Sequence, residues 1–136
     1  MVILMKYKDY NLPDDLQYNK DSSWVRVDGD IATVGIIEPA AKKVKEFVFV
    51  QLPEKKSISA GETYVTLEAV KWTGHLKSPV SGEIVEVNEE VYDEPSKINT
   101  NPYKAWIMKV KLSDTKEIND LHKPEEIMEW LDVALR

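Results

Sequence analysis

Short runs of apolar residues, several alternating with polar ones, recur along most of this chain between turn residues. Such runs favour β-strands with at least one buried face. The clearest strand candidates are residues 24–27, 30–36, 47–52, 64–67, 83–87 and 106–112. The first two meet at Asp28-Gly29, a dipeptide typical of tight hairpin turns. We therefore expect an antiparallel hairpin over residues 24–36.

Two segments have helical features instead. Glu38-Pro39 predicts the start of a short helix, because proline is tolerated at the first helical position. Pro124 predicts the start of a C-terminal helix over residues 124–135, whose apolar side chains form one stripe at Ile127, Trp130, Leu131 and Ala134. Residues 1–20 are mostly polar with interspersed tyrosines, and we expect them to form an N-terminal arm packed on the strands.

Residues 61–82 are the stretch around which the chain is organised. We predict a second antiparallel hairpin over residues 64–87, with Lys71 near its tip. β-Branched and aromatic residues favour the incoming strand, and Thr73-Gly74 supplies turn residues just past the lysine. A lone lysine on a hairpin is usually only a solvated surface residue. A functional role for Lys71 therefore depends on its neighbours.

Composition limits the kinds of function that are open to the chain. Its 136 residues, 43% hydrophobic and 31% charged, indicate one soluble globular domain over 1–136. Because the sequence has no cysteine, it offers no disulfide, no thiolate metal ligand and no thiol nucleophile. The net charge of −6 argues against nucleic acid as the main partner.

The sequence lacks the motifs of a self-sufficient enzyme. His75 and His122 are far apart, and no phosphate-binding glycine loop, nucleophile elbow or metal-ligand spacing is present. We therefore predict neither a metal nor a catalytic residue. The apolar residues 1–5 are too few for a signal peptide or a membrane span, so we expect a cytoplasmic protein without a membrane partner.

The residues around Lys71 resemble the lipoylation hairpin of glycine cleavage system H proteins. In that family a glutamate precedes the modified lysine by three positions and a glycine follows it by eleven. Glu68 and Gly82 occupy those positions, within Glu68-Ala69-Val70-Lys71 and Ser78-Pro79-Val80-Ser81-Gly82-Glu83. The related biotin carriers bracket their lysine with methionines, whereas Val70 and Trp72 flank this one, which favours lipoate.

The resemblance extends over residues 20–132, nearly the whole chain. The run WVRVDGDIATVGI matches the family's first hairpin, and residues 88–106 match at Asn88, Pro95, Ile98, Asn99, Pro102, Tyr103 and Trp106. It implies an all-β fold with minor helices, a barrel-sandwich hybrid like the flattened β-barrel of lipoyl and biotinyl carriers, with a C-terminal α-helix. We expect Trp24 and Trp106 to anchor its core.

The resemblance also implies a function. Lys71 would carry covalent lipoate, and Glu68 and Gly82 would be recognised by a lipoate ligase or lipoyl transferase. The chain would be a carrier component, not an enzyme. It would shuttle an aminomethyl group between a glycine decarboxylase, an aminomethyltransferase and a dihydrolipoamide dehydrogenase.

Several positions depart from the family pattern and leave alternatives open. They are Ser22 where a histidine is common, Gln51 for glutamate, Ala69, Trp72 and a loop one residue shorter at 104–105. One alternative is an H-like lipoate-binding protein of a heterodisulfide-reductase-like sulfur oxidation system. Another is an H-like fold without modification that serves as an interaction module.

Overall fold

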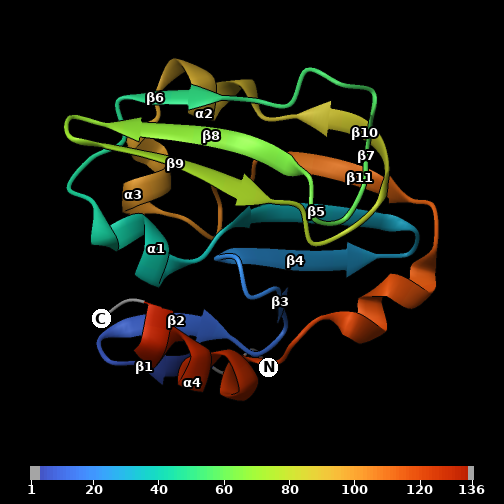
Figure 1. The fold of residues 1–136 in the computed structure, drawn as a ribbon, viewed down its shortest axis with the longest axis horizontal. Helices are drawn as coiled ribbons and strands as arrows, with labels where there is room; N and C mark the ends of the chain where they lie inside the picture. The colour runs from blue at the N-terminus through green and yellow to red at the C-terminus, as the bar shows by residue number, and fades with distance from the viewer. Residues whose placement is uncertain (1–3, 135–136) are drawn as a thin grey trace.

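The fold consists of a sandwich of two antiparallel β-sheets, a separate two-stranded sheet and a few short helices, in a computed structural model that describes residues 4–134 and the side chains of residues 4–131 (Figure 1). The larger sheet contains, in spatial order, β3 (Gln17–Tyr18), β4 (Ser23–Asp28), β5 (Ile31–Ile36), β11 (Met108–Leu112), β10 (Gly82–Val87) and β7 (Ser57–Ile58). The smaller sheet contains β6 (Phe49–Gln51), β8 (Thr63–Ala69) and β9 (Trp72–Lys77).

The main hydrophobic core contains residues from both sheets. Val34 and Val110 of the larger sheet and Leu67 of the smaller one are buried in the same cluster. This packing confirms the predicted all-β fold with minor helices and a C-terminal helix. The architecture is a flattened sandwich, and the sheets do not close into a barrel over the described residues.

A second hydrophobic cluster lies beneath the C-terminal helix α4 (Pro124–Ala134). The hairpin of β1 (Leu4–Tyr7) and β2 (Tyr10–Pro13) and the adjoining β3 pack against this helix (Figure 1). Tyr18 and Trp24 are buried beside Ile127 and Leu131, two residues of the predicted apolar stripe, and its Trp130 is partly buried against the same cluster. The side chain of Ala134 and residue 135 lie outside the described part.

Three short helices and one 3₁₀ helix occupy the remaining connections. The predicted start of α1 (Glu38–Lys43) at Glu38-Pro39 is confirmed. The sequence pattern did not predict α2 (Glu89–Asp93), α3 (Ser96–Thr100) or η1 (Thr115–Asp120). These elements are short and lack a sustained apolar period, so tertiary contacts stabilise them rather than an amphipathic pattern.

The predicted hairpin over residues 64–87 is wrong. The strand that forms a hairpin with β8 is β9, and the last cross-strand pair is Ala69 with Trp72. Thr73-Gly74 therefore lies within a strand instead of a turn, and β10 belongs to the other sheet. The strand β9 was missed because it is polar and mostly exposed, which weakens the alternation that marks a half-buried strand.

Three smaller expectations also need correction. The first turn is Gly29-Asp30, since Asp28 pairs with Ile31 in the strands. The predicted buried strand over 47–52 is the shorter edge strand β6, in which only the central Val50 is buried. Trp106 is only partly buried, whereas Trp24 is fully buried as expected.

Candidate functional site

The candidate site is the turn between β8 and β9, which projects at one end of the sandwich (Figure 1). Because Ala69 pairs with Trp72, Val70 and Lys71 form a two-residue turn. Val70 is 85% exposed and Lys71 is exposed. Among the described residues, the ammonium group of Lys71 makes no hydrogen bond or ion pair. The amine is thus accessible to a modifying enzyme, as the sequence predicts.

An open groove of about 620 Å³ lies beside this lysine. It is formed by the segment that follows α1 and by the tip of the hairpin, with the lining residues Val44, Lys45, Glu46, Val48, Ala69, Val70, Lys71 and Trp72. Five of these eight side chains are apolar. The groove therefore offers a hydrophobic surface next to the amine, while the charged side chains Lys45 and Glu46 keep it accessible to water.

The indole of Trp72, the residue directly after Lys71, anchors the hairpin tip to the core. Its ring centroid lies 6.0 Å from that of the buried Phe47, with the planes tilted by 43°. The indole also covers Gly74, where an added Cβ would lie 2.2 Å from the ring. Glycine at 74 is therefore required by the close approach of the tryptophan, and not by a turn as the sequence reading assumed.

The base of the hairpin is held by the loop that precedes β4. The Asp21 carboxylate accepts a hydrogen bond from the backbone N–H of Lys77, and the Asn19 amide donates to the Lys77 carbonyl at 3.1 Å. Burial raises the pKa of Asp21, against the smaller opposing effects of the hydrogen bond and of the positive charge of Lys77. These contacts tie the end of β9 to the rest of the protein.

The two predicted recognition residues lie at different places. Glu68 is exposed on β8, close to the turn and opposite Phe49 of β6. Gly82 begins β10 in the other sheet, beyond the base of the hairpin (Figure 1). A Cβ at Gly82 would lie only 2.0 Å from the backbone oxygen of Lys111. The structure therefore brings Glu68 near Lys71, whereas the close approach of Lys111 and a positive φ of 157° account for the glycine at position 82.

Two of the five departures from the family pattern border the lysine, and a third lies on the other side of Trp72. Ala69 and Trp72 line the groove, and Ser22 lines a cavity of about 80 Å³ behind Trp72. Ser22 has a positive φ of 63°, and its carbonyl accepts a hydrogen bond from Ile37 N–H at 3.0 Å. Gln51 and the segment 104–105 line other cavities, so they do not shape the groove.

The histidines do not assemble a catalytic or metal centre. His75 is exposed on β9 and lies 2.9 Å from the hydroxyl of Thr66, while His122 lies 2.9 Å from the carboxylate of Glu126. This contact with His122 lowers the pKa of Glu126. Within residues 4–131, no three His, Asp or Glu side chains are grouped so that they could hold a metal ion.

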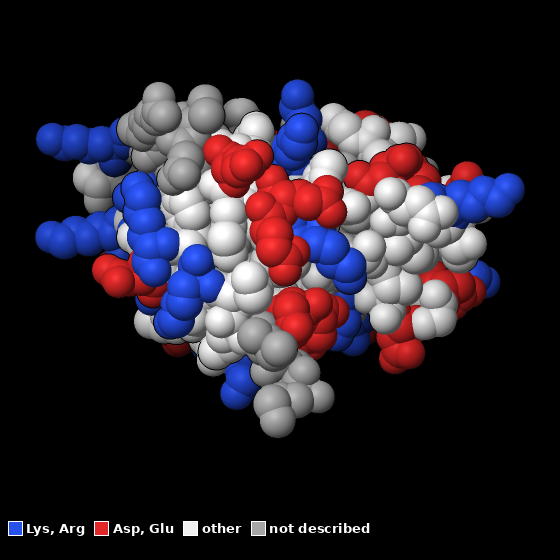
Figure 2. Space-filling model, turned by 90° about the horizontal axis from the view of Figure 1, so that it is seen from below, with Lys and Arg blue, Asp and Glu red and all other residues white. Residues whose placement is uncertain are grey.

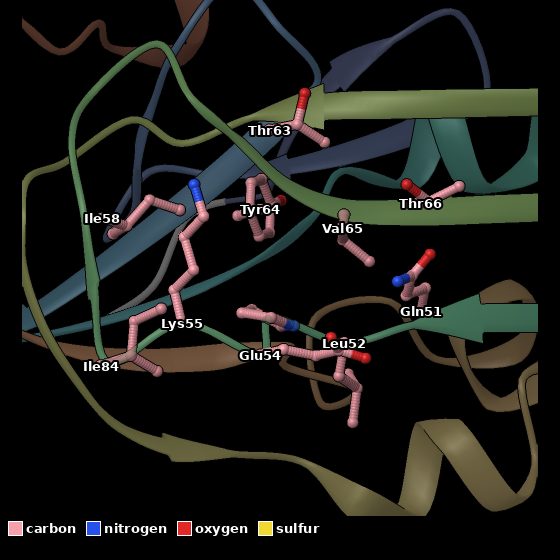
Figure 3. Close-up of a pocket in the computed structure, with 11 residues that line it drawn as sticks. Gln51, Leu52, Glu54, Lys55, Ile58, Thr63, Tyr64, Val65, Thr66 and Ile84 are labelled. Carbon is pink, nitrogen blue, oxygen red and sulfur yellow. The ribbon is translucent and has the colours of Figure 1, made fainter.

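A separate cavity of about 230 Å³ lies beside β8, away from the turn (Figure 3). It is bordered by Tyr64 and Val65 on one side and by the segment 51–55 on the other. The Tyr64 hydroxyl is hydrogen bonded to the Ser23 hydroxyl at 2.7 Å, and burial raises the pKa of Tyr64. The phenol is therefore part of the core and stays protonated at neutral pH.

Comparison with known proteins agrees with the geometry of the turn. The family model for the glycine cleavage H-protein matches residues 16–133. The chain belongs to this family. It is 42% identical over 122 residues to a glycine cleavage system H protein of Staphylococcus carnosus (strain TM300), which covers 88% of this chain and 97% of that protein.

A solved structure supports the same assignment. The crystal structure of a glycine cleavage system H protein from Mycobacterium marinum superimposes with a TM-score of 0.79 and is 34% identical. The match covers 89% of this chain and 99% of that one. The predicted family, fold class and role as a lipoyl carrier of the glycine cleavage system are therefore confirmed.

The family fixes the function at a coarse level. Members of this family carry lipoate and are carrier components instead of catalysts, and their partners belong to the glycine cleavage system. No helix among the described residues has both the length and the apolar character needed to cross a membrane.

Proposed function

We propose that Nζ of Lys71 carries the lipoyl group through an amide bond. The observation that supports this most directly is an exposed, unpaired ammonium group on a two-residue turn, in a chain of the H-protein family. Acylation requires that the enzyme reach the amine, and a turn held by paired strands presents it in one geometry. Among the described residues, no other lysine lies on a two-residue hairpin turn with a glutamate three residues earlier.

The surroundings of Lys71 fit an acyl chain with eight carbons and a dithiolane ring. The apolar side chains of Val44, Val48 and Trp72 line the groove beside the amine. They can cover part of a hydrophobic arm, whereas the open side lets the arm leave. When attached, the lipoyl group supplies the dithiolane, which undergoes the redox and group-transfer chemistry that the cysteine-free chain lacks.

The role of this chain is then positional. The hairpin, fixed at its base by Asp21 and at its tip by Trp72, holds Lys71 for successive partners. We assign these partners as a glycine decarboxylase, an aminomethyltransferase and a dihydrolipoamide dehydrogenase, after modification by a lipoate ligase or lipoyl transferase. Those enzymes perform the chemical steps, and the carrier holds the reacting group at high local concentration.

Mass spectrometry tests the attachment site. The chain is expressed with a lipoate ligase and lipoate, and its intact mass is measured. We expect the wild-type chain to gain the mass of one lipoyl group and the Lys71→Arg variant to gain none. Lys45→Arg is a matched control, because Lys45 is also an exposed lysine that lines the same groove. It should be modified as the wild type is.

Two outcomes would contradict the proposal. A lipoyl adduct that persists in Lys71→Arg would place the site elsewhere. A wild-type chain that gains no mass, although the same ligase modifies a control acceptor, would instead favour an interaction module without modification.

A second assay tests the partners. We expect the lipoylated chain to support glycine–bicarbonate exchange by the glycine decarboxylase and the Lys71→Arg chain to support none. If lipoylated protein fails in this exchange, and Lys71→Ala leaves glycine use in cells unchanged, the carrier belongs to another system. A heterodisulfide-reductase-like sulfur oxidation complex would then be the next candidate.

A further inference from the structure

Exposed apolar side chains gather at one side of the hairpin tip. Among the described residues, seven large hydrophobic side chains are exposed, and five of them lie on or directly after the turn, on or just before β6, or on α2. These five are Val48, Phe49, Val70, Trp72 and Tyr92. Because contiguous apolar surface in water is unfavourable and marks interaction sites, this clustering indicates a surface that another molecule covers.

The centre of this surface is an aromatic pair. The ring centroids of Phe49 and Tyr92 lie 6.1 Å apart, with the planes at 70°. Both side chains line an open groove of about 450 Å³ together with Gln51, Leu52, Pro53, Glu54, Val87 and Glu89. Phe49 is 38% and Tyr92 51% exposed, so each retains apolar area for a partner. We call this surface the β6–α2 groove.

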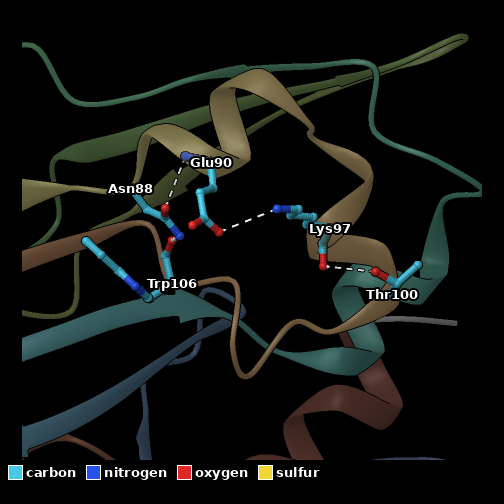
Figure 4. Close-up of polar contacts among 5 residues, drawn as sticks. All are labelled: Asn88, Glu90, Lys97, Thr100 and Trp106. Atoms are coloured by element: carbon cyan, nitrogen blue, oxygen red, sulfur yellow. Dashed lines mark hydrogen bonds and ion pairs between the residues drawn. The ribbon is translucent and has the colours of Figure 1, made fainter.

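The helix that carries Tyr92 is held rigidly (Figure 4). Asn88 caps α2, because its side-chain oxygen accepts from Glu90 N–H at 3.1 Å while its amide donates to the Trp106 carbonyl at 2.9 Å. Lys97 of α3 lies 3.5 Å from the Glu90 carboxylate. The groove is therefore preformed, which lowers the entropic cost of binding.

Two carboxylates, those of Glu54 and Glu89, line the groove with the aromatic pair. The helix α2 and its C-terminal cap also carry Glu90, Asp93 and Glu94, of which Glu90 faces the cavity beside α3. In the described part of the chain, the only ion pair that these five carboxylates form joins Glu90 to Lys97. The face that carries α4 also presents acidic side chains (Figure 2). What distinguishes the β6–α2 groove is thus acidic charge around exposed aromatic rings.

We propose that the β6–α2 groove docks the partner enzymes of the carrier through an apolar projection flanked by lysine or arginine. Complementary charge around an apolar centre is the arrangement of specific protein interfaces. A second copy of this chain is disfavoured as the occupant, because a two-fold symmetric contact would bring two acidic grooves together and their charges would repel. The same charge disfavours nucleic acid and anionic lipid.

Docking in this groove would leave Lys71 accessible to the partner. Phe49 pairs with Glu68, three residues before Lys71, and Val48 lines the groove at the turn. A partner held on Phe49 and Tyr92 therefore lies beside the turn without covering it. The inference rests on the proposed function. It assigns partner recognition to the β6–α2 groove and attachment of the lipoyl group to the neighbouring turn.

Kinetics with the lipoylated chain as the varied substrate test the inference. The glycine decarboxylase, the aminomethyltransferase and the dihydrolipoamide dehydrogenase are assayed separately with wild type, Tyr92→Ala and the double variant Glu89→Lys/Asp93→Lys. With at least one enzyme, we expect each change to raise KM on the order of tenfold with little change in kcat. Added salt should raise the wild-type KM and affect the charge-reversed chain less.

The double variant Asp120→Lys/Glu129→Lys is the matched control. It changes the net charge equally, but on η1 and α4, and both side chains are exposed. If it raises KM as much as the α2 variant does, long-range charge explains the effect and the docking site is wrong. A KM that is unchanged by the groove variants with all three enzymes would also overturn the inference.

Failure of the inference can be told apart from failure of the proposed function. A wild-type chain that is lipoylated and turned over, with groove variants that behave like it, refutes only the docking site. A wild-type chain that no enzyme turns over refutes the proposed function, and the docking inference falls with it. Intact mass and circular dichroism of each variant confirm that modification and folding are retained.

Discussion

The ring of Trp72 packs 6.0 Å from the ring of Phe47 and ties the residue after Lys71 to the core. Val70 and Lys71 themselves have no such support and remain exposed. The turn therefore combines a fixed backbone with a side chain that can move. A carrier needs both properties, because the modifying enzyme must recognise one geometry while the attached arm reaches several partners.

Replacing Trp72 by alanine should loosen the turn. Trp72 is 36% exposed, so its truncation removes only part of a buried aromatic contact, and we expect a loss of about 1–2 kcal/mol in the free energy of unfolding. Urea denaturation measures it. Val70→Ala is the control and should change stability by less than about 0.5 kcal/mol. Equal effects of the two changes would show that the contact with Phe47 does not hold the turn.

Lys71→Ala should leave stability almost unchanged. The side chain is exposed and has no ion pair or hydrogen bond among the described residues, so the free energy of unfolding should change by less than about 0.5 kcal/mol. Lipoylation should disappear in the same variant. A large loss of stability, measured by thermal or urea denaturation, would mean that Lys71 is a structural residue.

The two tryptophans that the sequence predicts as core anchors should differ in their effects. Trp24 is fully buried, and its indole N–H donates to the Pro102 carbonyl at 3.1 Å. Trp24→Ala should therefore cost about 3–5 kcal/mol. Trp106 is only partly buried, with the Lys109 ammonium 4.8 Å from its ring, so Trp106→Ala should cost about 1–2 kcal/mol. Equal losses would contradict this ranking.

The sequence predicted the elements with strong local signals. The hairpin over 24–36, the helix starts at Glu38 and Pro124, and the exposure of Lys71 follow from alternation, proline placement and turn residues. It did not predict the strand β9. That strand is paired by backbone hydrogen bonds on one side only, and most of its side chains are exposed. A strand of this kind shows little alternation of apolar and polar residues in the sequence.

The surroundings of the lysine were harder to predict because they depend on distant contacts. The packing of Trp72 on Phe47 and the approach of Lys111 to Gly82 join segments that are 25 and 29 residues apart. The β6–α2 groove likewise depends on Phe49 meeting Tyr92. No local pattern specifies these pairs. Family resemblance marked Gly82 as important, but only the structure shows a packing reason for it.

Gly82→Ala separates a packing role from a recognition role. An added Cβ would lie 2.0 Å from the Lys111 carbonyl oxygen, so β10 or β11 must shift, and we expect a loss of about 1–3 kcal/mol. Glu83→Ala, at the exposed next position, is the control. If packing is the whole role, folded Gly82→Ala protein should be lipoylated at the wild-type rate. A slower rate in stable, folded protein would support direct recognition by the ligase.

Asp21 should make stability fall as the pH rises. Burial raises the pKa of its carboxyl above the ordinary value of 3.8, so the folded protein binds the proton more tightly than the unfolded chain. This contribution is fully present below 3.8 and is lost as the pH rises through the folded pKa. Asp21→Asn cannot titrate, yet its amide oxygen can still accept from Lys77 N–H.

The difference in unfolding free energy, wild type minus Asp21→Asn, should therefore decrease from about pH 3 to about pH 7. Urea denaturation across that range measures it, and the subtraction removes the titration of other carboxylates, including Glu126. The opposite slope would mean that Asp21 is stabilised in its charged form. The hydrogen bond from the Lys77 backbone N–H and the positive charge of Lys77 would then outweigh burial, and both would hold the base of the hairpin more strongly as the carboxyl ionises.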